Sequence, residues 1–353
     1  MVDPSTLTLT TTDGVETTVT CPPGQTVIDA AAEQSVILPS LCGQGACGAC
    51  LATVTKGDYT SLPSSPDAMG PMAGDGAALL CCTVPTGDLK IDLPYDQSRI
   101  VSSAPPRRTA TITTLESVGH GVVRMVLLLD ADDTHGSAAE FDPGQFVQLE
   151  VPGREDLRAY SLANVGNWDG ELEFYIHVLP KGVFSDYLRD RAAVGDTLTV
   201  IGPQGAFGLR ETGLRPRWFI GGGTGLAPLL SMMRRMAEWG DPQPVRAYLG
   251  VTTEADLFGL DQIAEVCSML AESQVTIAIW RPTGDLAEVV VPDGMRVVAG
   301  SVADALDEDL AGLGQRPDIY VCGPPGMVQA LEYVLAENGV DPQFVVTERF
   351  TEN

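Results

Sequence analysis

The sequence predicts a three-domain protein of mixed α+β and α/β class: a small β-rich domain, an antiparallel β-barrel, and a doubly wound parallel sheet. Three observations predict this organisation. Six of the eight cysteines lie within the first 82 residues, the middle third consists of short apolar runs, and from Pro216 onward strand-like and helix-like segments alternate. A length of 353 residues suits two or three domains.

Composition narrows the class of protein. Apolar residues make up 44% of the chain and charged residues 19%, which predicts a packed core. A formal net charge of −26 argues against nucleic acid as a partner, because such proteins neutralise phosphates with basic surfaces. The first ten residues lack the basic and apolar regions of a signal peptide, and no apolar run is long enough to span a membrane. We therefore expect a cytoplasmic protein without a membrane partner.

The first domain, expected over 1–98, begins with strand signals. Residues 5–20 are rich in Thr and Val around Asp13-Gly14, a pair that predicts a hairpin with a tight primed turn. Thr26 is placed to cap a short helix, and residues 88–95 resume the strand pattern. A linker is expected at 99–108, followed by a barrel domain at 109–212 and a parallel-sheet domain at 213–353.

Four cysteines carry the strongest chemical signal. Cys42-x4-Cys47-x2-Cys50, followed by Cys81 after thirty intervening residues, is the plant-type 2Fe-2S spacing. Glycines between these cysteines let the backbone fold tightly and point N–H groups at sulfur. Zinc is the competing metal, although structural zinc sites prefer two closely spaced pairs of cysteines. Cys81 is favoured over Cys82 as the fourth ligand because an apolar pair precedes it, which leaves Cys82 as a bystander.

The middle domain contains two motifs suited to a flavin nucleotide. The fork of Arg158 can grip a diphosphate oxygen, the ring of Tyr160 can stack on an isoalloxazine, and Ser161 can hydrogen-bond near its reactive N5. About twenty residues later a helix begins whose free N–H groups suit pyrophosphate. The candidate residues there are Lys181, Gly182, Val183 and Ser185. His177, on the preceding strand, is a further candidate; its alternative is an ordinary satisfied side chain.

The last domain contains a glycine-rich turn between an apolar strand and a helix. Such glycines allow a backbone to reach a pyrophosphate, and the candidates are Gly221, Gly222, Gly223, Thr224 and Gly225. A free ribose 2′-hydroxyl favours an acid after the second strand, whereas a 2′-phosphate needs a cation. Glu254 follows that strand, and no Lys or Arg occurs between Arg246 and Arg281, which predicts NADH rather than NADPH.

These motifs together carry a family resemblance. Residues 1–98 resemble the ferredoxin domain of NADH-dependent oxygenase reductases, and residues 57–100 are most similar to reductases of soluble di-iron monooxygenases that hydroxylate methane and alkanes. The R-x-Y-S and K-G-V-F-S motifs and Gly202-Pro203-x-Gly205 resemble the ferredoxin-NADP reductase superfamily. The resemblance implies a β-grasp ferredoxin domain and FAD in the barrel, with FMN as the alternative.

The same resemblance assigns the C-terminal residues. It implies that Cys322, Gly323 and Pro324 lie beside the nicotinamide, with Cys322 orienting the ring and not acting as a nucleophile. Glu348-Arg349-Phe350 resembles the terminal tail of the family, whose aromatic residue lies near the flavin; the alternative is an ordinary chain end. Ser161, Cys322 and Phe350 are therefore the residues expected nearest the reacting atoms.

The predicted function is that of an oxygenase reductase. Electrons would pass from NADH through FAD and a 2Fe-2S cluster to the hydroxylase of a di-iron monooxygenase. One alternative partner is a Rieske-type aromatic-ring dioxygenase. The chain could instead be a free-standing flavin or quinone reductase, or a redox sensor or docking adaptor. The acidic composition further predicts salt-sensitive docking to a basic patch on the partner.

Overall fold

The computed structural model describes residues 3–71, 73–154, 156–210, 212–311 and 316–350. The chain divides into two compact units, Met1–Pro105 and Pro106–Asn353. The first unit contains the cysteine-rich segment, and the second contains both the barrel and the parallel sheet. Among the described residues, no helix combines the length and the apolar character needed to cross a bilayer.

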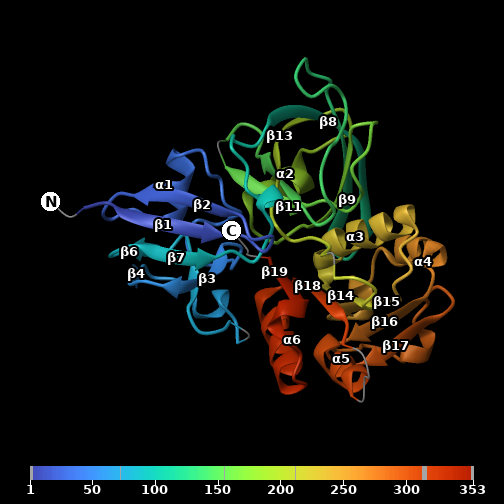
Figure 1. Cartoon of the computed structure of the whole chain (residues 1–353). Coiled ribbons are helices and arrows are strands. Elements are labelled where there is room, and N and C mark those ends of the chain that lie inside the picture. The colour runs from blue at the N-terminus through green and yellow to red at the C-terminus, as the bar shows by residue number, and fades with distance from the viewer. Residues whose placement is uncertain (1–2, 72, 155, 211, 312–315, 351–353) are drawn as a thin grey trace. The chain divides into compact units, whose positions relative to one another are not determined.

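The N-terminal unit is a mixed five-stranded sheet with one helix packed on it (Figure 1). The strand order is β2-β1-β7-β3-β5, in which β1 pairs with β7 in parallel. The elements are β1 Ser5–Thr10, β2 Glu16–Cys21, α1 Val27–Glu33, β3 Leu51–Lys56, β5 Ala77–Leu79 and β7 Leu89–Asp92, with a separate pair formed by β4 Tyr59–Ser61 and β6 Thr83–Pro85. This arrangement confirms the predicted β-grasp domain.

The predicted hairpin and helix cap of this unit are both present. β1 and β2 pair antiparallel, from Ser5 opposite Cys21 to Thr10 opposite Glu16. Their connection is longer than a two-residue primed turn, because Thr11 N–H and hydroxyl both bond the carbonyl of Val15 at 3.1 Å. The expected tight turn is therefore wrong in its length. Thr26 caps α1, and its hydroxyl accepts the N–H of Asp29 at 3.2 Å.

The middle of the chain forms a six-stranded antiparallel sheet in the order β11-β10-β13-β8-β9-β12, which confirms the predicted barrel. Its strands are β8 Arg107–Gly119, β9 Val122–Leu129, β10 Phe146–Glu150, β11 Leu157–Ser161, β12 Glu171–His177 and β13 Thr197–Gln204. Helix α2, Val183–Asp190, inserts Phe184 and Tyr187 into the barrel core beside Leu149 and Phe174. The helix is therefore anchored by apolar burial, which fixes its N-terminus near β11.

The C-terminal part is an all-parallel sheet in the order β17-β16-β15-β14-β18-β19, the predicted doubly wound fold. Helices α3 and α4 cover one face, and α5 and α6 cover the other (Figure 1). The strands are β14 Arg217–Gly222, β15 Val245–Val251, β16 Ser273–Ile279, β17 Met295–Ala299, β18 Asp318–Gly323 and β19 Val345–Arg349; the helices are α3 Leu226–Trp239, α4 Leu260–Met269, α5 Val302–Leu310 and α6 Pro325–Glu337. The strand order reverses between β14 and β18, where open sheets of this kind bind ligands.

A buried ion cluster joins the barrel to the parallel sheet. The carboxylate of Glu173 on β12 is bonded by Arg124 on β9 at 2.6 Å and by Arg234 on α3 at 2.5 Å. On the same helix, the hydroxyl of Ser231 donates to the carbonyl of Asn164 at 2.5 Å. Because Glu173 is only 6% exposed, its negative charge depends on these two guanidiniums for compensation. These contacts hold the two folds as one unit.

Candidate functional site

The four predicted cluster ligands come together in one loop region of the N-terminal unit. Cys47, Cys50 and Cys81 are buried, and Cys42 is partly exposed. The thiols form two pairs, in which Cys42 contacts Cys47 and Cys50 contacts Cys81. Among the described residues, no group of three or more metal-binding side chains surrounds a position for a single ion. Two pairs of thiolates are instead what two bridged tetrahedral irons require.

The backbone around these thiols suits a sulfur-rich centre. The N–H groups of Gln44 and Ala46 point at the Cys42 sulfur, at 3.4 and 3.3 Å. Gly45 has φ of +68°, and a Cβ there would lie 2.6 Å from both the Cys82 sulfur and the Ser64 Cβ. Only glycine therefore fits at this position. Donors aimed at sulfur stabilise negative charge, so the residues present fit a 2Fe-2S cluster held by thiolates.

Cys82 is closer to the ligand set than the sequence indicates. Its side chain is 5% exposed, and its sulfur lies 3.8 Å from the Cys81 sulfur and 3.8 Å from the carbonyl of Pro63. Adjacent residues cannot easily ligate one centre together, so the assignment of Cys81 as the ligand and Cys82 as a neighbour stays a prediction.

The two flavin motifs lie on neighbouring elements of the barrel. Tyr160 on β11 packs against Phe184 at the start of α2, with ring centroids 5.2 Å apart. Ser185 in the same turn accepts the N–H of Leu179 at 3.0 Å, which fixes the chain just before the helix. Within the part of the chain that the structure describes, no side chain caps the N-terminus of α2 at Gly182. An edge strand with an aromatic residue therefore stands beside uncapped N–H groups, the arrangement that a flavin diphosphate needs.

Three charged or titratable candidates of the flavin site have few protein partners. The guanidinium of Arg158 donates to the carbonyl of Leu157 at 2.8 Å. Lys181 is exposed in the turn before α2. His177 is exposed at the end of β12, and its ring lies along the backbone of Gly121. Their contacts with a flavin stay predictions.

The glycine-rich turn of the parallel sheet lies directly against the Cys322 turn. A Cβ on Gly225 would overlap the carbonyl of Cys322, and a Cβ on Gly222 would overlap the sulfur of Met327. Gly222 ends β14, and Gly323 ends the neighbouring β18. The two predicted nucleotide segments are thus brought together at the switch point of the sheet. The two turns can pack this closely only because glycine has no Cβ at these positions.

The central finding is a carboxyl group that links the flavin motif to the nicotinamide motif. Glu348 on β19 accepts the Ser161 hydroxyl at 3.3 Å and lies 3.7 Å from the Cys322 sulfur. Burial raises the pKa of Glu348 to about 7. Burial beside this carboxyl also raises the pKa of Cys322 well above its usual range. Cys322 therefore stays a neutral thiol, which suits orientation of a ring and does not suit nucleophilic attack.

The sequence indicates Glu348 only as part of the chain's tail, and no motif predicts its pairing with Ser161. The tail is fixed by a buried ion pair, in which Arg349 donates to Glu332 on α6 at 2.5 Å and both side chains are 4% exposed. The N–H of Phe350 then bonds the carbonyl of Gly323 at 3.0 Å. Phe350 is thereby held beside the Cys322 turn, within the described part of the tail.

The acids after β15 are engaged by protein donors. Both carboxylate oxygens of Glu254 accept hydrogen bonds from the loop that follows β16: the N–H of Thr283 at 2.8 and 3.0 Å, its hydroxyl at 2.9 Å, and the N–H of Gly284 at 3.1 Å. Backbone hydrogen bonds lower the pKa of Glu254 to about 2. Asp256 accepts the N–H and hydroxyl of Thr253, both at 2.9 Å. The pairing of Glu254 with a ribose stays a prediction.

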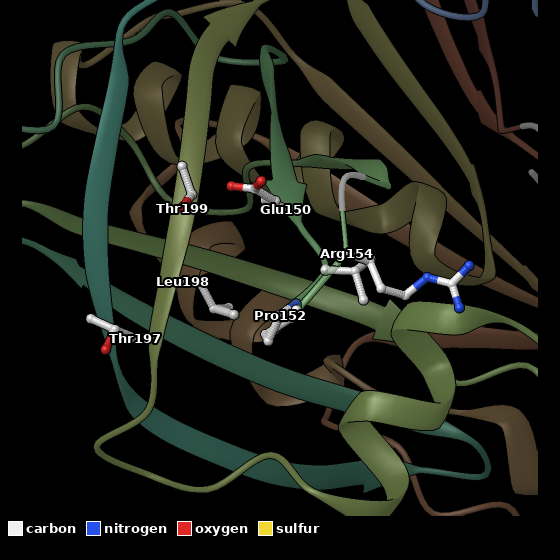
Figure 2. Close-up of a pocket in the computed structure, with 8 residues that line it drawn as sticks. Glu150, Pro152, Arg154, Thr197, Leu198 and Thr199 are labelled. Atoms are coloured by element: carbon white, nitrogen blue, oxygen red, sulfur yellow. The ribbon is translucent and has the colours of Figure 1, made fainter.

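A separate cavity of about 380 Å³ lies beside the turn between β10 and β11 (Figure 2). It is lined by Glu150, Val151, Pro152, Gly153, Arg154, Thr197, Leu198 and Thr199. Arg154 extends away from the other labelled side chains and pairs with Asp156 at 2.6 Å. No residue of the predicted flavin motifs lines this cavity, so it is distinct from the candidate site.

Three protein families match successive parts of the chain. The 2Fe-2S iron-sulfur cluster binding domain matches residues 10–86. The oxidoreductase FAD-binding domain matches residues 109–208, and the oxidoreductase NAD-binding domain matches residues 219–332. The cofactors are therefore a 2Fe-2S cluster, FAD and NAD, as the cysteine, barrel and glycine motifs predict.

Curated relatives and solved structures agree with this assignment. The reductase component of propane 2-monooxygenase from Rhodococcus jostii is 33% identical over 331 residues, covering 92% of this chain and 86% of the relative. Methane monooxygenase component C from Methylosinus trichosporium is 37% identical, covering 75% of each chain. The toluate 1,2-dioxygenase electron transfer component from Pseudomonas putida is 33% identical, covering 96% of each.

Among solved structures, a cytochrome P450 reductase from Amycolatopsis has a TM-score of 0.70 at 29% identity, covering 98% of this chain and 99% of the other. A ferredoxin reductase in carbazole 1,9a-dioxygenase has a TM-score of 0.67 at 26% identity, covering 99% of each chain. The domain order, the fold and the full-length relatives lead to one assignment. The chain belongs to the family of oxygenase reductase components, iron-sulfur flavoproteins that join a 2Fe-2S ferredoxin domain to FAD- and NAD-binding oxidoreductase domains.

Proposed function

We propose that this chain is the reductase component of a multicomponent monooxygenase and passes electrons from NADH to a di-iron hydroxylase. The observation that carries the proposal is the junction of Ser161, Cys322 and Glu348, which joins the flavin motif to the nicotinamide motif. When bound, FAD accepts the electron pair of a hydride and releases single electrons that a 2Fe-2S cluster can carry.

Residues of the barrel would hold the flavin. The N–H groups at the start of α2, with Lys181 beside them, and the guanidinium of Arg158 are proposed to bind the diphosphate. Tyr160, already packed on Phe184, is proposed to support the isoalloxazine ring. The hydroxyl of Ser161 is proposed to hydrogen-bond the ring edge. Anchoring of the motif by the barrel core pre-organises these groups.

Residues at the switch point would hold and orient NADH. The turn Gly221–Gly225 is proposed to bind the pyrophosphate through its backbone, and Cys322, Gly323 and Pro324 to form one wall of the nicotinamide site. The Arg349–Glu332 pair holds Phe350 at Gly323, which suits a side chain that excludes water from the reacting atoms. An ionised Glu348 would stabilise the positive charge that develops on nicotinamide as it loses hydride.

The proposed partner distinguishes the main function from its alternative. Propane and methane monooxygenase relatives support a monooxygenase hydroxylase, and the toluate dioxygenase relative supports an aromatic-ring dioxygenase as the second candidate. The test is to reconstitute the purified chain with an alkane hydroxylase or with a Rieske dioxygenase and to compare the rates of NADH-dependent turnover. Faster NADH-dependent turnover with the dioxygenase would contradict the main proposal.

The electron path is tested without a partner. Anaerobic titration with NADH is expected to bleach the flavin absorption and then to produce the paramagnetic signal of a reduced 2Fe-2S cluster. Bleaching of the flavin without that signal would contradict the path. We also propose that the chain acts in the cytoplasm, where all eight cysteines, unpaired in the structure, would stay reduced. Cell fractionation tests this location.

A further inference from the structure

A fifth sulfur, that of Cys82, lies beside the four predicted cluster ligands. It is 3.8 Å from the Cys81 sulfur and 3.8 Å from the carbonyl oxygen of Pro63. The side chain of Cys82 is 5% exposed, so little water competes for its hydrogen bond. A thiol carries one proton and is a weak donor. The thiol proton of Cys82 therefore has two neighbouring acceptors, one of which is a cluster ligand.

Ligation of iron determines which of these two acceptors is the stronger. A cysteine that binds iron is a thiolate, so Cys81 has no proton of its own to donate to Cys82. A thiol outside the ligand set is protonated at neutral pH. An ionised acceptor forms a stronger hydrogen bond than a neutral carbonyl does. When the cluster is bound, the thiol of Cys82 is therefore expected to donate to the Cys81 sulfur and not to Pro63.

The surrounding backbone holds Cys82 in this position. The N–H of Leu62 bonds the carbonyl of Cys82 at 2.7 Å, and the N–H of Ser65 bonds the carbonyl of Gly45 at 2.9 Å. Gly45 belongs to the ligand loop, and a Cβ there would lie 2.6 Å from the Cys82 sulfur. The ligand loop and the segment 62–65 thus pack on the thiol together. A donor that is already fixed loses little conformational freedom when it forms a hydrogen bond.

The charge of this unit makes a donor at the cluster important. Residues 35–55, which include three of the four ligands, contain no Lys, Arg or His, and residues 1–105 contain eleven acidic and three basic side chains. Reduction adds negative charge to the cluster and its thiolates, and that charge is disfavoured in an acidic unit. Hydrogen bonds to the sulfurs stabilise the reduced form and so raise the reduction potential. Backbone N–H groups of Gln44 and Ala46 point at Cys42, whereas Cys82 supplies a side-chain donor at Cys81.

We propose that Cys82 tunes the 2Fe-2S cluster by donating a hydrogen bond from its thiol to the Cys81 sulfur, which raises the reduction potential of the cluster. The inference rests on the proposed function, because it concerns the centre from which single electrons leave the chain. Cys82 acts through Cys81 and is a positioning residue, not a ligand. A higher cluster potential shifts the equilibrium between reduced flavin and oxidised cluster toward the reduced cluster.

The test is an anaerobic titration of the full-length holoenzyme with dithionite, in which the paramagnetic signal of the reduced cluster gives its potential. Cys82→Ala removes one weak donor to a charged sulfur and should shift the equilibrium toward the oxidised cluster about three- to tenfold, or about 28 to 59 mV for one electron. Cys82→Ser keeps a proton donor and should restore most of this shift. Cys21→Ala is the matched control and should leave the potential unchanged. Cys21 is also a buried thiol of this unit, but its sulfur lies 3.6 Å from the carbonyls of Pro22 and Gln25.

Three results would overturn the proposal. The first is a shift below about 1.5-fold in Cys82→Ala, and the second is a potential in Cys82→Ser as low as that in Cys82→Ala. The third is loss of the cluster absorption in both variants, which would make Cys82 a ligand. Dithionite reduces the cluster directly, so the measured potential does not depend on NADH. Failure of NADH to reduce the cluster of the wild-type holoenzyme would contradict the proposed function instead.

Discussion

Glu348 titrates in the range where enzymes work, and this property gives a quantitative prediction. Burial raises its pKa to about 7, and its carboxyl lies between Ser161 and Cys322. For a group with this pKa, the ionised fraction rises from about 0.1 at pH 6 to about 0.9 at pH 8. Only the ionised form can stabilise a developing nicotinamide cation, so flavin reduction by NADH should accelerate about tenfold over that interval.

The assay is anaerobic stopped-flow reduction of the flavin at saturating NADH from pH 6 to 8.5. Glu348→Gln should be slower at pH 8 and should show no midpoint near 7. Ser161→Ala should move the midpoint upward, because the Ser161 hydroxyl donates to the carboxyl and lowers its pKa. A wild-type rate independent of pH, or a Glu348→Gln variant with the native profile, would refute the reasoning.

The same pKa predicts how stability changes with pH. The pKa of this carboxyl is about 4.5 in the unfolded chain and about 7 in the folded chain. At any pH between these two values, the folded chain therefore binds more protons than the unfolded chain. Stability therefore falls as pH rises from about 4.5 to about 7, by at most about 3 kcal/mol. Since this window begins near pH 4.5, urea unfolding of the flavin-free chain at pH 5.5 and pH 8 should show about 2 kcal/mol of this loss in the wild type and a smaller loss in Glu348→Gln.

Three other substitutions test the remaining parts of the site. Cys81→Ser should abolish the visible absorption and paramagnetic signal of the cluster whereas Cys82→Ser should retain both; the reverse outcome would reassign the ligand. Glu173→Gln should destabilise the unit at 106–353 by about 2 kcal/mol in urea unfolding, because two partly buried guanidiniums lose their carboxylate. A change below about 0.5 kcal/mol would show that the two guanidiniums find other partners. Gly225→Ala should raise KM for NADH about tenfold or more, because a Cβ at this position overlaps the carbonyl of Cys322. Gly326→Ala is the control and should leave KM unchanged, because no atom lies within 4 Å of the added carbon. Equal KM values for the two variants would contradict the steric argument.

Sequence alone predicted those parts whose residues lie close together in the chain. The spacing Cys42-x4-Cys47-x2-Cys50 is local, and the constraint on Gly45 follows from folding such a loop around sulfur. The barrel and the parallel sheet follow from the periodicity of apolar runs, which is again a local property. Turn length was less predictable, since the connection after Thr10 depends on hydrogen bonds that the Asp13-Gly14 pair does not specify.

Contacts set by strand order could not be predicted in the same way. Ser161 and Glu348 are 187 positions apart and meet because β11 lies at the edge of one sheet and β19 at the edge of another. Glu254 and Thr283 are 29 positions apart and meet because the parallel pairing of β15 with β16 brings together the loops that follow these strands. Parallel strands require long crossover connections, so neighbours at the carboxyl edge of such a sheet are distant in sequence. Chain distance is therefore a poor guide to side-chain contacts at that edge.

The division of the chain into units matches the demands of the two kinds of electron transfer. Hydride transfer forms and breaks bonds, so donor and acceptor must be held in contact with correct orientation. Two contacts join the barrel to the parallel sheet: the ion pair of Glu173 with Arg234 and the hydrogen bond from Ser231 to Asn164. Within the same unit, the Ser161 hydroxyl donates a hydrogen bond to Glu348. Single-electron transfer makes no bond and needs no such contact. The cysteine-bearing fold can therefore be a unit of its own, with its own core, without loss of the chemistry at the flavin.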